Sequence, residues 1–131
     1  MKPAECGSLE SFSFGDSPEM ADELLSLVLS GRKTATCWGV CQGEQTHVGK
    51  TMVVRDGSGA PAAVLETLEL VKRRFDEVDA AFAHDEGEGD RSLAYWRDVH
   101  RRYFTRHGIF APDMELWCER FRVVARLSPS G

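Results

Sequence analysis

The sequence predicts an α+β domain built around a small, mostly antiparallel sheet or barrel. Two segments with helical spacing of apolar residues alternate with short segments rich in β-branched and aromatic residues, and a turn signal near the middle indicates a hairpin. The length of 131 residues suits one domain, and a composition of 42% hydrophobic and 28% charged residues excludes disorder as the main state. We expect residues 1–131 to form a single domain with loose ends at about 1–10 and 126–131.

The first element is a helix over about residues 18–30. Ser17 can act as N-cap, Pro18 suits the first helical position because no N–H is needed there, and Gly31 can stop the helix. One face of this helix is apolar at helical spacing, which predicts that it packs on the core: Met20, Ala21, Leu24, Leu27 and Val28.

Strands follow. The β-branched and aromatic content of residues 34–40 predicts one strand, and residues 51–55 predict another. The turn signal Asp-Gly-Ser-Gly at residues 56–59 precedes an extended pattern over 62–71. Residues 51–71 are therefore expected to form a hairpin.

The second half begins with a short helical piece around residues 75–83 and a Gly-broken acidic loop over residues 85–90. A long helix is expected from about 92 to 107, and residues 116–127 alternate as a closing strand. One arc of the long helix is predicted to face the core, with His100 inside it; the arc consists of Leu93, Trp96, Val99, His100, Tyr103 and Phe104.

The charge pattern limits the partners. Sixteen basic against 21 acidic residues give a net charge of −5, which argues against a non-specific binder of double-stranded DNA. Five arginines between residues 91 and 107 still leave a local basic surface, which can either meet phosphates or be a solvated face. No run approaches the roughly 18 apolar residues of a membrane helix, and the first residues lack an apolar signal region. We therefore expect a cytoplasmic protein with no membrane partner.

The cysteines form no regular disulfide framework. Cys37, Cys41 and His47 lack a fourth ligand and the tight spacing of a zinc site, and Cys6 and Cys118 stand far away in the sequence. We expect no metal and no cofactor.

The turn at residues 31–36, Gly-Arg-Lys-Thr-Ala-Thr, is the most suggestive segment. Lys33 and Thr36 are three residues apart across the turn, so their side chains could converge. A threonine hydroxyl is a weak nucleophile unless a base takes its proton, and a lysine can be that base only if its pKa is lowered. From the residues alone, a solvated Lys33 and an ordinary strand residue at position 36 remain the simpler alternative.

Four segments in this order resemble the ASCH (activating-signal-cointegrator homology) family of the PUA-like superfamily: 14–18, 31–36, 87–97 and 118–121. The resemblance extends from about residue 12 to 125. It implies a small, mostly antiparallel β-barrel with flanking helices. It also implies a cleft for RNA or a nucleoside-like ligand.

Small bacterial members of this family include amidohydrolases that deacetylate N4-acetylcytidine with a Lys–Thr–Glu triad. By resemblance the triad is Lys33, Thr36 and Glu88, with Glu86 the next best match for the carboxylate. The broader family pattern, Gly-x-Lys-x-x-Glu-x-Arg, differs here at Thr36 and Trp38, which moves the turn toward the Lys-x-x-Thr enzymes.

The resulting hypothesis is a hydrolase acting on a modified pyrimidine nucleoside. In it, Lys33 accepts the proton of Thr36, and Glu88 positions the substrate or protonates the leaving nitrogen. One alternative is a module that binds single-stranded RNA, with or without ribonuclease activity. Another is a ligand sensor without chemistry. Core packing remains an alternative for Trp38 and His100. The candidate substrate contacts are Arg32, Thr34, Trp38, Glu86, Arg97, His100 and Arg101.

Overall fold

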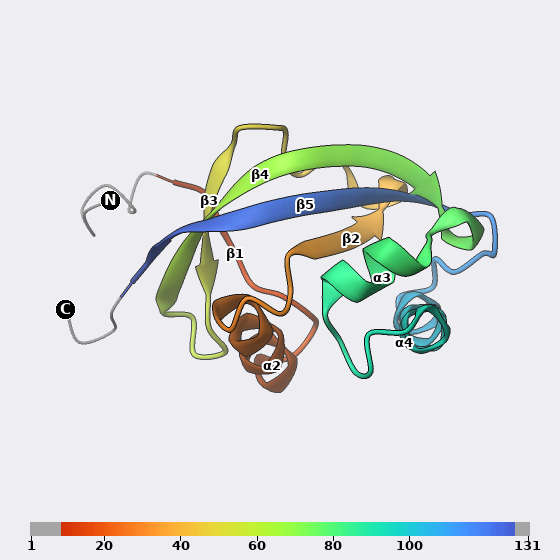
Figure 1. Cartoon of the computed structure of the whole chain (residues 1–131), viewed down its shortest axis with the longest axis horizontal. Coiled ribbons are helices and arrows are strands. Elements are labelled where there is room, and N and C mark those ends of the chain that lie inside the picture. The colour runs from red at the N-terminus through yellow and green to blue at the C-terminus, as the bar shows by residue number, and fades with distance from the viewer. Residues whose placement is uncertain (1–8, 128–131) are drawn as a thin grey trace.

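A sheet curved over three α-helices makes up the structure, a computed structural model that describes residues 9–127 (Figure 1). The long strands arch across the molecule, and the helices lie on the concave side of the sheet. In chain order the elements are β1 (Ser11–Phe12), α2 (Pro18–Leu29), β2 (Ala35–Gly39), β3 (Thr51–Arg55), β4 (Pro61–Arg74), α3 (Ala80–Glu86), α4 (Leu93–Arg106) and β5 (Glu115–Arg126), with 3₁₀ turns at Val40–Gln42 and Phe75–Glu77.

The expected α+β class with flanking helices is confirmed, and the sheet is mixed. Its strand order is β1-β3-β4-β5-β2, with β1 parallel to β3 and all other pairs antiparallel. Within residues 9–127 the sheet is not closed into the expected barrel, because the edge strands β1 and β2 do not pair with each other. Instead, side chains of both edge strands, β1 and β2, line the same cavity.

Most predicted elements are found with ends shifted by a few residues. The hairpin of β3 and β4 turns at residues 56–59 as expected, but β4 runs on to Arg74. The two-residue strand β1 was not predicted. The short helical piece is displaced: it splits into a 3₁₀ turn and α3, whose N-cap Asp79 accepts a hydrogen bond from the backbone N–H of Phe82 (2.9 Å).

Two apolar clusters fill the concave side of the sheet. One packs α3 and α4 against β2 and β5, and the other packs α2 against β3 and β4. Trp96 and Phe104 are buried as the helical arc predicted. None of the helices in the described part of the chain is long and apolar enough to cross a membrane.

The ends of the described segment are tied to the sheet. The N–H of Val53 donates to the carbonyl of Glu10, and the N–H of Leu127 donates to that of Ala62. The rest of the expected loose ends, 1–8 and 128–131, and Cys6 with them, lie outside the described residues.

Candidate functional site

The turn after α2 directs Lys33 into the molecule. Gly31 adopts a positive φ of +83°, and the N–H groups of Arg32 and Lys33 both donate to the carbonyl of Leu27. The N–H of Thr34 then donates to the carbonyl of Asp85 (2.7 Å), which fixes the turn against α3. This turn buries Lys33 to 2% exposure and leaves Thr34 at the surface.

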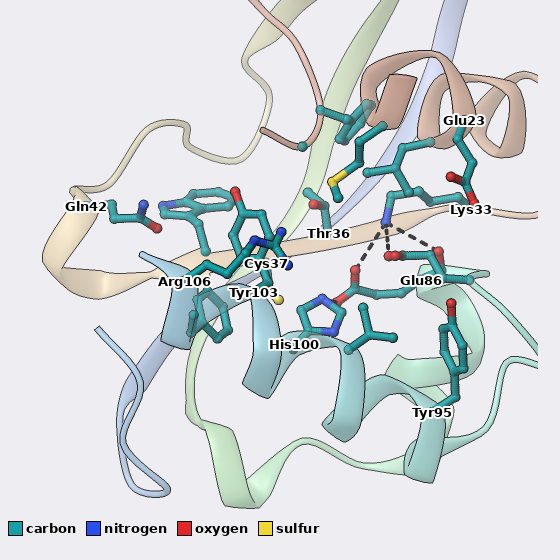
Figure 2. Close-up of a pocket in the computed structure, with 18 residues that line it drawn as sticks. Glu23, Lys33, Thr36, Cys37, Gln42, Glu86, Tyr95, His100, Tyr103 and Arg106 are labelled. Carbon is teal, nitrogen blue, oxygen red and sulfur yellow. Dashed lines mark hydrogen bonds and ion pairs between the residues drawn. The ribbon is translucent and has the colours of Figure 1, made fainter. Parts of the chain in front are cut away.

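Two glutamates contact the Lys33 ammonium: Glu86, the last residue of α3, and Glu88 in the loop that follows. Figure 2 shows Glu86 beside Lys33. Its Nζ donates to Glu86 Oε1 (3.1 Å), to Glu88 Oε2 (3.2 Å) and to the carbonyl of Glu86 (3.3 Å). Gly87, with a φ of +75°, reverses the chain after α3, and both carboxylates on either side of it reach the same ammonium. An ammonium has three N–H donors, so those of Lys33 are all used.

These contacts decide the charge of Lys33. Burial lowers the pKa of Lys33, but the carboxylates of Glu86 and Glu88 raise it more, so the pKa lies above its ordinary value. The expectation that the pKa is lowered is therefore wrong for the free protein. The sequence indicated the lysine but not the two anions that keep it charged.

Glu86 is the most enclosed member of the site. Besides Lys33, it accepts a hydrogen bond from Trp96 Nε1 to Oε2 (2.6 Å), and His100 Nε2 lies 3.7 Å from the same oxygen. Burial raises the pKa of Glu86, but Lys33 and then His100 lower it further than burial raises it. Glu86 is therefore a buried, ionised anchor.

His100 is fixed between helix and carboxylate. Its Nδ1 lies 2.9 Å from the carbonyl of Trp96, which can only accept, so Nδ1–H donates to that carbonyl, and Nε2 faces Glu86. The imidazole stacks on the indole of Trp96 at 4.3 Å. Cys37, Glu86 and His100 are the one group of three potential metal ligands within residues 9–127, and the Lys33 ammonium already supplies positive charge beside them.

The cavity beside this cluster, which we call the charged lobe, also contains Thr36. The Thr36 hydroxyl has no hydrogen-bond partner among residues 9–127. Since every buried side-chain oxygen or nitrogen described has a partner, this hydroxyl is open to the cavity. The charged lobe is lined by Phe14, Gly15, Met20, Glu23, Leu24, Lys33, Thr36, Cys37, Trp38, Gln42, Glu86, Glu88, Tyr95, Val99, His100, Tyr103, Phe104 and Arg106.

A second cavity, which we call the polar lobe, continues on the other side of Thr36 and Trp38. Volumes of about 210 and 190 Å³ leave each lobe below the roughly 300 Å³ of a small-molecule site. The two lobes adjoin because they share lining residues, and we call them together the groove. Glu119 lines this lobe, and sequence reasoning gave it no role. The polar lobe is lined by Phe12, Ser13, Phe14, Gly15, Thr36, Cys37, Trp38, Gln42, Gln45, Thr46, Met52, Tyr103 and Glu119.

The structure thus brings together Lys33, Thr36, Trp38, Glu86, Glu88 and His100 of the sequence-predicted residues. The other four lie outside both lobes. Arg32 donates to the carbonyls of Gly87 and Gly89, so it clamps the α3–α4 loop, and Thr34 Oγ1 contacts the carbonyl of Asp85. Arg97 and Arg101 are exposed on the outer face of α4, where Arg101 pairs with Asp98.

Solved structures of related proteins share this fold. An ASCH domain from Lactobacillus crispatus is 33% identical, with a TM-score of 0.83 over 93% of this chain and 83% of that chain. A protein from Enterococcus faecalis is 34% identical, with a TM-score of 0.81 over 89% of this chain and 77% of that chain.

More distant comparisons add less. A variant of an ASCH protein from Zymomonas mobilis is 12% identical over 92% of this chain and 74% of that chain, and its TM-score of 0.53 indicates likeness of fold alone. No curated protein matches the sequence. The family model of the ASCH domain matches residues 10–125, nearly the whole described segment, and the chain therefore belongs to the ASCH domain family.

Proposed function

We propose that this ASCH domain hydrolyses an acylated pyrimidine nucleoside, in the first instance an N4-acylated cytidine. The observation on which the proposal rests is a buried ammonium–carboxylate cluster beside a threonine hydroxyl that has no partner among residues 9–127, both in one cavity. The likeness of the Gly31–Thr36 turn to the Lys-x-x-Thr amidohydrolases supports the same chemistry. Lys33, Thr36 and Glu88 are the proposed catalytic residues.

Glu88, and not Lys33, is the proposed proton acceptor. All three N–H donors of Lys33 are used, and its pKa lies above the ordinary value of a lysine. Lys33 is therefore protonated near neutral pH and cannot act as a base. The carboxylate of Glu88 has one ion pair among the described residues, and its side chain is 18% exposed. Glu88 is therefore open to the cavity and within reach of a ligand, as a general base must be.

The proposed reaction proceeds through an ester on Thr36. The hydroxyl attacks the amide carbonyl while Glu88 takes its proton, and the same proton passes to the nitrogen as the C–N bond breaks. Water then hydrolyses the ester to release the carboxylic acid. Lys33 stays protonated and supplies positive charge on the cavity wall where the oxyanion develops.

A hydrolysis assay with N4-acylated cytidines of increasing acyl length tests the proposal, with cytidine release as the readout. Replacing the base with an isosteric amide, Glu88→Gln, should lower kcat by about 10²- to 10⁴-fold. The exposed Arg101 on α4 provides the matched control, and Arg101→Ala should keep the activity of the wild type. Full activity of Glu88→Gln, or no cytidine from any of these substrates, contradicts the proposal.

A further inference from the structure

The polar lobe has a chemical character of its own. Its described lining includes one carboxylate, that of Glu119, together with the neutral polar side chains of Gln42, Gln45 and Thr46, and it includes no lysine or arginine. A phosphate group would meet a negative side chain there without a basic side chain to offset it. The lobe therefore suits an uncharged part of a ligand that carries hydrogen-bond donors.

A chain of hydroxyls holds Glu119 in place. Thr67 Oγ1 donates to Glu119 Oε2 (2.7 Å) and lies 2.7 Å from Thr46 Oγ1. Since Thr67 has one hydroxyl proton and gives it to Glu119, Thr46 must donate to Thr67. Both threonines are buried, so this relay fixes one oxygen of the carboxylate and leaves the other for a ligand.

That second oxygen, Oε1, has no partner among the residues that the structure describes. It is not buried, because every buried side-chain oxygen described has a hydrogen bond, so it is open to the polar lobe. Burial raises the pKa of Glu119, with Thr67 and Lys33 opposing that change. A poorly solvated acceptor of this kind gains more than a surface carboxylate does when a ligand N–H is directed at it.

The sheet register sets the distance between Glu119 and the reacting atoms. Glu119 on β5 is directly opposite Thr36 on β2, and such cross-strand partners have Cβ atoms about 5 Å apart on one face. If Thr36 attacks the acyl carbonyl, Glu119 lies within reach of the ring edge next to the scissile amide. A ribose on the far side of the ring would be out of its reach. This step rests on the proposed function.

We propose that the polar lobe is a recognition subsite for an aminopyrimidine ring and that Glu119 accepts a hydrogen bond from the exocyclic N–H of that ring. Trp38 lines both lobes, and its indole N–H is fixed to the carbonyl of Gly43 (2.7 Å), so its ring forms a rigid wall beside the bound heterocycle. Glu119 is thus a specificity-determining residue, separate from the Lys33 cluster.

Binding of two nucleosides tests the subsite without any turnover. Cytidine carries the exocyclic amino group, and pyrimidin-2-one ribonucleoside lacks only that group. Calorimetry should show that the wild type prefers cytidine by roughly tenfold or more, the effect of one hydrogen bond to a charged acceptor. Glu119→Ala should bind the two nucleosides equally. Glu66→Ala, which removes a carboxylate of β4 paired with Arg122 outside both lobes, should keep the preference.

Glu119→Gln is a second variant that keeps the side-chain shape. Its amide oxygen can accept from Thr67 and turn the NH₂ group toward the ligand, so this variant should also lose the preference. A preference for cytidine that survives in a folded Glu119→Ala protein overturns the proposal, as does a wild type that binds neither nucleoside at millimolar concentration. If the wild type prefers cytidine but hydrolyses no acylated cytidine, the result supports the subsite and contradicts only the proposed function.

Discussion

Thr36 lines both lobes of the groove, and its hydroxyl, which has no partner in the described part of the chain, leads to the first prediction. If this oxygen forms the ester, Thr36→Ala should lower kcat by at least about 1,000-fold, whereas Thr36→Ser should keep measurable activity because a hydroxyl remains. Steady-state assays with N4-acetylcytidine check this. Equal rates for Thr36→Ala and the wild type would rule out Thr36 as the nucleophile.

Lys33 is a buried charged residue, and its loss leads to a prediction about stability. Lys33→Met leaves the Glu86 carboxyl buried without its main partner, and breaking a buried pair in this way costs about 3–5 kcal/mol. Urea unfolding at neutral pH measures the loss. Lys50→Met, which removes the ion pair with the exposed Glu10, should stay within about 1 kcal/mol of the wild type.

The pH dependence of this loss provides its check. The lowered pKa of Glu86 stabilises the wild type above the ordinary value of 4.5, and that stability is lost as the pH falls through the folded-state pKa. The raised pKa of Lys33 stabilises the protein below 10.5 and is lost only at higher pH. In Lys33→Met the buried Glu86 protonates easily. The difference between the two proteins should therefore begin to narrow above pH 4.5, as Glu86 of the variant takes up a proton, and narrow further below pH 4.5, as the wild type loses its stabilisation. A constant difference from pH 7 down to pH 3 would contradict the assigned charges.

At the scale of single residues, the sequence indicated the candidate reacting groups but not their surroundings. The turn pattern pointed to Lys33 and Thr36, and the acidic loop supplied Glu86 and Glu88. The charge state of Lys33 depends on contacts across more than 50 residues of sequence, which no local pattern contains. Glu119 was missed because its relation to Thr36 is a matter of register between distant strands.

Among the elements, the loop that leaves α3 is the most constrained, and two glycines allow a matched test. Gly87 and Gly31 both have positive φ, +75° and +83°. A Cβ at Gly87 would lie 2.4 Å from the carbonyl oxygen of Arg32, whereas one at Gly31 would meet nothing within 4 Å.

Gly31→Ala should therefore cost only the backbone strain, about 1 kcal/mol. Gly87→Ala should cost clearly more, about 2–4 kcal/mol, because the loop has to move away from the turn. It should also lower activity, since Glu86 and Glu88 flank the displaced residue. Thermal unfolding of the two variants, with their hydrolysis rates, measures both effects, and equal losses would show that the close contact is unimportant.

The helices and strands were largely predictable from the sequence, and the errors in predicting them have local causes. Strong N-caps and an apolar face defined α2 and α4, and a Gly-rich turn defined the β3–β4 hairpin. β1 has two residues, too few for a periodic signal, and is a strand only because β3 lies beside it. The start of α3 was misplaced because Asp79, its N-cap, was included in one continuous helical piece.

At the scale of the whole molecule, the charge distribution gives a test that distinguishes binding of a nucleoside from binding of RNA. The net charge is −5, and three of the four arginines of α4 pair with acids, Arg101 and Arg102 with Asp98 and Arg106 with Asp16. Affinity for cytidine should change less than about twofold between 50 and 500 mM salt, measured by calorimetry. Binding of a single-stranded RNA with a log–log slope near −0.7 for each neutralised phosphate would instead favour the RNA-binding alternative.

The pairing of β2 with β5 also has a consequence for how the protein is made. Thr36 is on a strand whose only neighbour in the described sheet is β5, formed from residues 115–126, so early and late segments have to meet before the groove exists. During synthesis, α2 and the β3–β4 hairpin can form on the ribosome while β2 still lacks its partner. Such long-range pairing slows folding, and a nascent chain gains its groove only after residues 115–126 have emerged from the ribosome.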